Sequence, residues 1–167
     1  MVDTSAIVRR AHPILFITLA VISFIAAVIA STIVTDYNNN GNPPSTSLNN
    51  ATRFTVFASW WTFVISTAYA VLFLINKGGV FTSIAGHAIS TFLTFIFVTA
   101  SAGSLTDATG GALTCSRDRI VYCGSTRALQ AFVWIEWGLL VIILALVAFI
   151  GAGSFRGGRS VKEPLTA

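Results

Sequence analysis

Residues 13–34, PILFITLAVISFIAAVIASTIV, form an apolar run that contains no charged side chain. Arg9 and Arg10 precede it, and Asp36 follows it. About 20 consecutive apolar residues are enough for a helix to cross the hydrocarbon core of a bilayer. We therefore predict a membrane-spanning helix here. The alternative is a secretory signal peptide cleaved after residues 28–30, but the run is longer than the apolar core of such a peptide.

Three further apolar runs follow, and together they predict four spans. The spans cover about 13–35, 54–75, 80–105 and 128–150, separated by a loop at 36–52, a tight turn at 76–79 and a polar loop at 106–127. Only 10% of the 167 residues are charged, against about 25% in a soluble domain. The sequence therefore predicts an all-α, integral membrane four-helix transmembrane bundle.

The spans divide the chain into three parts and suggest its orientation. The parts are an N-terminal segment 1–8, a transmembrane domain 9–150 and a flexible basic tail 151–167. Four spans place both termini on one side, and Lys and Arg are more numerous on that side than on the other. The first set is Arg9, Arg10, Lys77, Arg156, Arg159 and Lys162, and the second is Arg53, Arg117, Arg119 and Arg127. Because cytoplasmic loops carry the excess of Lys and Arg, we predict that both termini are cytoplasmic.

The net charge of +4 also invites a nucleic-acid interpretation, which the distribution of the basic residues argues against. These residues lie in short segments between apolar runs and do not form a basic face on an amphipathic helix. Their position sets membrane orientation instead. We therefore expect no nucleic-acid partner.

Cys115 and Cys123 are the only cysteines, and both lie in the loop after the third predicted span. The seven residues between them can close a small disulfide ring, which requires an oxidising compartment outside the cytoplasm. Free thiols in a cytoplasmic loop are the alternative. A metal site is not expected, because two cysteines without a nearby histidine cannot supply four ligands.

Asn50-Ala51-Thr52 is a glycosylation sequon in the loop after the first span. It falls on the same predicted outer face as the cysteine pair. Its closeness to Arg53 and to the membrane argues against glycan attachment at Asn50.

Glu136 is the acidic residue of the fourth predicted span. An acid at the centre of a spanning helix costs about 2.5–3.5 kcal/mol, so it should face the bundle interior. It could serve a proton-coupled or lipid-headgroup site, or be a protonated carboxyl that hydrogen-bonds neighbouring helices. His87 lies one or two turns into the third span, near the cytoplasmic side, whereas Glu136 is expected nearer the outside. We therefore expect no direct His–Glu proton relay.

The four tryptophans follow arginines at similar intervals. Trp60 and Trp61 come seven and eight positions after Arg53, and Trp134 and Trp137 come seven and ten positions after Arg127. All four are therefore expected at similar depth in the outer leaflet, as lipid-facing aromatics. They form either an ordinary aromatic belt or a sterol- or lipid-binding surface between the second and fourth spans.

Motifs for catalysis are absent from the sequence. There is no phosphate-binding glycine loop, no HExxH and no GxSxG. We therefore expect neither an enzyme nor a cofactor.

The layout resembles the MARVEL domain, and most closely its small fungal members. The resemblance rests on residues 115–117 and 123–134, CGSTRALQAFVW, and on Arg53-Phe54 followed by Trp60 and Tyr69. It covers roughly residues 9–150. It implies a non-enzymatic role in lipid microdomains or membrane apposition, in the plasma membrane or an endomembrane. The partners it implies are membrane lipids, with a sterol as one candidate, and further copies of itself or other membrane proteins.

Two other functions stay open. The protein could be a small oligomeric transporter or channel that uses Glu136. It could also be an accessory subunit of a larger membrane complex.

Overall fold

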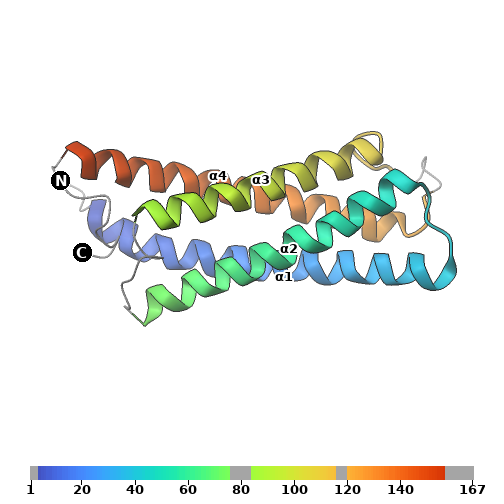
Figure 1. The fold of residues 1–167 in the computed structure, drawn as a ribbon, viewed down its shortest axis with the longest axis horizontal. Helices are drawn as coiled ribbons and strands as arrows, with labels where there is room; N and C mark the ends of the chain where they lie inside the picture. Colours follow the sequence, from blue (N-terminus) through green and yellow to red (C-terminus); the bar gives the residue numbers. More distant parts are fainter. Residues whose placement is uncertain (1–3, 76–83, 116–119, 157–167) are drawn as a thin grey trace.

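The computed structural model describes residues 4–75, 84–115 and 120–156 of the chain (Figure 1). Within these ranges the elements are the helices α1 (Thr4–Asn40), α2 (Thr46–Leu74), α3 (Ile84–Ala108) and α4 (Cys123–Arg156). Each is long and apolar enough to cross a membrane, over Pro13–Asn40, Thr46–Leu74, Gly86–Ala108 and Cys123–Phe149 respectively. The predicted all-α four-helix transmembrane bundle is confirmed, and the chain is an integral membrane protein.

The helices run in alternating directions along one long axis (Figure 1). The first turns of α1 and the last turns of α4 lie at the same end, where α2 ends and α3 begins. Helix α1 packs against α2 and α4, and α3 packs against the same two helices. The pairs α1/α3 and α2/α4 therefore face each other across the diagonals, as in an up-and-down bundle.

The loop predicted at 36–52 is wrong in extent, because α1 and α2 leave only residues 41–45 between them. Gly41 follows α1 with a positive φ of 60°, which a glycine adopts without steric cost. Ser45 caps α2, and its hydroxyl accepts a hydrogen bond from the Leu48 amide at 3.1 Å. Hydropathy missed these turns because their side chains are polar although their backbone is helical.

The ends of the chain also differ from the predicted parts. Helix α1 begins inside the predicted segment 1–8, and α4 continues past the predicted end of the last span at residue 150. The remainder of the predicted tail, from residue 157 onward, and the predicted turn at 76–79 lie outside the described residues.

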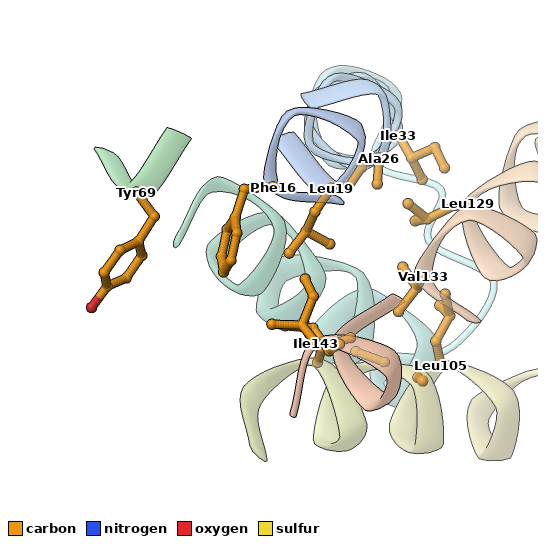
Figure 2. Close-up of a cluster of buried hydrophobic side chains, with 14 of the residues drawn as sticks. Phe16, Leu19, Ala26, Ile33, Tyr69, Leu105, Leu129, Val133 and Ile143 are labelled. Carbon is orange, nitrogen blue, oxygen red and sulfur yellow. The ribbon is translucent and has the colours of Figure 1, made fainter. Parts of the chain in front are cut away.

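Buried residues recur on each helix at alternating intervals of four and three, the spacing that packs helices in coiled coils. On α1 they are Phe16, Leu19, Ser23, Ala26, Ala30, Ile33 and Tyr37, and on α4 Leu129, Val133, Glu136, Leu140, Ile143 and Val147. We call this pair of stripes the apolar seam. Figure 2 shows Leu19 and Ile33 of α1 and Val133 and Ile143 of α4 among the side chains that fill the interior.

The corresponding stripes on α2 and α3 bear mostly hydroxyl side chains. They are Thr52, Thr55, Ser59, Thr62 and Ser66 on α2, and Thr91, Thr94 and Ser101 on α3, which we call the hydroxyl seam. Thr62 and Thr94 each donate to the carbonyl four residues earlier, at 2.8 Å. The hydroxyls of Thr55 and Ser101 also meet across the two helices at 2.8 Å. Such small side chains let helices approach closely where lipid supplies no hydrophobic drive.

Candidate functional site

Glu136 occupies a position of the apolar seam, one step from Val133 and one from Leu140, and its side chain has no exposed surface. Helix α4 begins at Cys123, before the apolar run that set the predicted start of the span, and it continues to Arg156. The depth of Glu136 relative to the two membrane surfaces stays a prediction.

A small polar side chain lies beside Glu136, and small side chains occur at the same level of α1. The Ser59 hydroxyl of α2, also buried, lies close to the carboxyl. Neither carboxyl oxygen of Glu136 nor the Ser59 hydroxyl completes a hydrogen bond within the described parts of the chain. Trp60, next to Ser59, contacts Phe24 and Ser31 of α1, so residues 24–31 lie beside this level. This part of α1 contributes the fully buried Ala26 and Ala30.

His87 is buried at a different position along the bundle axis from Glu136, and aromatic side chains surround it. The centroid of its imidazole lies 4.4 Å from the ring centroid of Tyr69, 5.1 Å from that of Phe16 and 5.9 Å from that of Phe73, each pair in edge-to-face geometry. Ser59 and Tyr69 are ten residues apart on α2, about 15 Å along the helix axis. The structure therefore does not bring His87 and Glu136 together.

The tryptophans connect neighbouring helices. Each indole N–H donates to a hydroxyl on another helix: Trp60 to Ser31 (3.3 Å), Trp61 to Thr94 (3.2 Å), Trp134 to Thr106 (3.1 Å) and Trp137 to Thr99 (3.1 Å). Trp60 and Trp134 are 38% and 43% exposed, and the other two are half-buried. Sequence reasoning missed these bonds because the partner hydroxyls lie on other helices, where no local pattern marks them.

An apolar groove of about 370 Å³ lies between α1 and α2 on the outer surface of the bundle. Its lining comprises Ile17, Ala20, Val21, Phe24, Phe63, Thr67, Ala70 and Val71. Phe24 closes it toward the middle of the bundle, where its ring packs 5.3 Å from that of Phe63 and 6.0 Å from that of Trp60. The volume falls within the range of small-molecule sites. The sequence did not point to this groove, because it arises between two helices.

The disulfide predicted between Cys115 and Cys123 is present, with an S–S distance of 2.07 Å. Tyr122, next to it, packs its ring 5.8 Å from that of Tyr37 and accepts a hydrogen bond from the Asn40 side chain at 2.9 Å. These contacts attach the disulfide loop to the last turns of α1.

Gln130, near the start of α4, is bonded to the end of α3 and to the residues just after it. Its side-chain amide donates to the Gly111 carbonyl at 3.0 Å and to the Thr106 hydroxyl at 3.1 Å. The sequon residue Asn50 is exposed near the start of α2, and its glycosylation stays a prediction.

Comparison with known proteins yields no relative. The chain matches no protein-family model, and no curated protein or solved structure is significantly similar to it. In the ranges that the structure describes, no group of three or more His, Cys, Asp or Glu could hold a metal ion. The features available for function are thus a buried carboxyl, an apolar groove on the lipid-facing surface and a braced loop at one end.

Proposed function

We propose that the protein is a non-enzymatic membrane-organising protein that holds a lipid against its surface, in lipid microdomains or at sites of membrane apposition. The observation that supports this role is the groove between α1 and α2, whose lining is apolar and faces the surrounding membrane. The role is also the one that resemblance to the MARVEL domain implies. Self-association and contacts with other membrane proteins belong to the same proposal.

The groove suits a rigid or tightly packed hydrocarbon. It runs from Phe63, near the middle of α2, to Val71, near the end of the helix. Aromatic side chains lie at one end of it and small side chains such as Ala20 and Ala70 form its floor, so a flat apolar body could contact both helices. A sterol ring system or an ordered acyl chain has this shape. We favour the sterol, because a rigid ligand loses less conformational entropy on binding.

Photocrosslinking in nanodiscs tests this function. We expect a photoreactive sterol to label α1 and α2 of the purified protein, and unlabelled sterol to compete. Val21→Trp places a large ring in the groove from an exposed position and should lower labelling several-fold. Val141→Trp, at an exposed position on α4 away from the groove, is the matched control. Equal labelling of all three proteins would contradict the proposal.

The second candidate is a small oligomeric transporter or channel, and the full burial of Glu136 inside a spanning helix is the observation that favours it. Acidic residues inside spans often mark ion or proton pathways. Flux of protons or solute into liposomes that Glu136→Gln abolishes would favour this candidate. Sterol-dependent clustering without flux would favour the organising role.

The proposed orientation places both termini in the cytoplasm, in the plasma membrane or an endomembrane. The disulfide supports it, because the bond would then form on the oxidising side. Protease protection of terminal epitope tags in sealed vesicles distinguishes the two orientations. Cleavage of both tags from the outside of right-side-out vesicles would reverse the assignment.

A further inference from the structure

We propose that Glu136 and Ser59 form a proton-binding site at the centre of the bundle, where the neutral carboxyl links the diagonal helices α2 and α4. This goes beyond the organising role and does not depend on the lipid groove. It rests on the position of the carboxyl, the absence of a counter-charge and the state of the Ser59 hydroxyl.

The position of Glu136 separates it from water. Its side chain is fully buried, between Val133 and Leu140 in the apolar seam of the spanning helix α4. An isolated carboxylate in such surroundings costs several kcal/mol, and a group in that situation takes up a proton to become neutral. The site is thus one in which the bound proton removes a charge that the packing cannot accommodate.

Among the described residues of the neighbouring helices, no charged side chain lies where it could neutralise a carboxylate at position 136 in place of the proton. Burial and the Ser59 hydroxyl affect the protonation of this carboxyl. Within the described chain, no charged side chain adds to their effect. On α2, Arg53 is exposed and donates to Asn38 at 2.6 Å. On α3, His87 lies among aromatic side chains near one end of the helix, and Asp107 is exposed near the other end. On α1, residues 13–35 contain no ionisable side chain.

Ser59 differs from the hydroxyl residues around it. The side chains of Thr52, Thr55, Thr62 and Ser66 each donate to the carbonyl four residues earlier on α2. The Ser59 hydroxyl makes no such bond although it is as buried as they are. A small rotation of either side chain would form an O–H···O bond with the carboxyl of Glu136. Because α2 and α4 are diagonal, that bond would cross the bundle interior.

The consequence is a coupling between the proton and the packing of the bundle. Loss of the proton leaves a carboxylate that needs water, and water can reach it only if the helices separate. Opening the bundle therefore favours proton release, and by linkage the folded bundle loses stability as pH rises. Protonation and tight packing should be gained and lost together.

Infrared spectroscopy of the full chain in lipid nanodiscs tests the protonation state. We expect a carboxylic-acid C=O band near neutral pH that Glu136→Gln removes. Asp107→Asn, which changes an exposed acid, should leave the band intact. Absence of the band, or a band that Glu136→Gln does not affect, would overturn the proposal. Glu136→Leu, which continues the apolar seam, serves in place of Glu136→Gln if that variant does not fold.

The role of Ser59 has its own readout. Ser59→Ala should shift the frequency of the Glu136 band, because the hydrogen bond to the acid is lost. Thr62→Ala is the matched control, since the Thr62 hydroxyl bonds the carbonyl of Ala58 in its own helix. An identical frequency in wild type and Ser59→Ala would remove Ser59 from the site.

Thermal unfolding against pH tests the coupling. As pH rises above about 4.3, the ordinary pKa of a glutamate in an unfolded chain, the wild-type midpoint temperature should fall until the site has lost its proton, and Glu136→Leu should remove the part of the fall that belongs to this site. The same pH dependence in both proteins would overturn the coupling. Restoration of stability by sodium at high pH, lost in Glu136→Leu, would show that a metal cation and not a proton is the ligand.

Discussion

The apolar seam of α1 and α4 and the hydroxyl seam of α2 and α3 fill the same interior by different means. The first uses large side chains such as Phe16, Leu140 and Ile143, which interlock at heptad spacing. The second uses small hydroxyl side chains whose hydrogen bonds stay mostly within their own helix. The bundle is thus held together by the interlocking of large side chains in the apolar seam and by the close approach of two helices in the hydroxyl seam. Ser23 and Glu136 are the polar members of the apolar seam, and Glu136 is the one that can carry a charge.

The largest effect should come from the apolar seam. Phe16→Ala removes a buried ring that contacts Tyr69, Phe73 and His87 from α1. We expect a loss of about 3–5 kcal/mol in the free energy of unfolding, because the cavity left behind cannot collapse fully. Denaturant titration in bicelles measures it. Phe149→Ala, at a position 68% exposed on α4, is the control and should change little.

The next largest effect should come from disturbing the close packing of α1 against its neighbouring helices. Ala30 has no exposed surface, so Ala30→Leu forces a larger side chain between packed helices. We expect a cost of about 1–3 kcal/mol from overpacking, measured by the same titration. Val28→Leu, at an exposed position on the same helix, should be close to neutral. A neutral Ala30→Leu would mean that the apolar seam is not tightly packed.

A smaller effect is expected from the hydrogen bonds that join a helix of the apolar seam to a helix of the hydroxyl seam. The Trp137 indole of α4 donates to the Thr99 hydroxyl of α3 at 3.1 Å. Trp137→Phe keeps a ring beside Phe95 and deletes this bond, so we expect a loss of about 0.6 kcal/mol, the average for such bonds in a membrane protein. A double-mutant cycle with Thr99→Val isolates the bond. A coupling energy of zero would show that the bond adds no stability.

The smallest effect should come from a side chain of the hydroxyl seam whose hydroxyl bonds only within its own helix. Thr62→Val keeps the shape of the side chain and removes a hydroxyl that bonds only its own helix, so we expect less than about 0.5 kcal/mol. Thr55→Val should cost more, about 1 kcal/mol, because it leaves the buried Ser101 hydroxyl without its partner on α2. Stability assays on the two variants therefore separate shape from bonding between helices. Equal losses would contradict the distinction.

Much of the architecture was predictable because it depends on local composition. Charge-free runs are long enough to span a bilayer, and the burial cost of an acid predicts that Glu136 faces inward. The heptad of α4 was hidden, since exposed residues such as Ile135 and Ile142 are as apolar as buried ones such as Leu140. Periodicity of hydrophobicity cannot distinguish the two faces of a helix when both lie in apolar surroundings.

Local sequence was sufficient to predict the all-helical class, the number of spans and the cysteine pair able to form the disulfide. Each of these follows from composition or spacing over a few residues, because in the hydrocarbon core every backbone polar group must find its hydrogen bond within the protein. Three features could not be predicted in this way: the approach of Ser59 to Glu136, the hydroxyl partner of each indole on another helix and the groove between α1 and α2. These features depend on the rotation and register of one helix against another, which packing of the whole bundle sets.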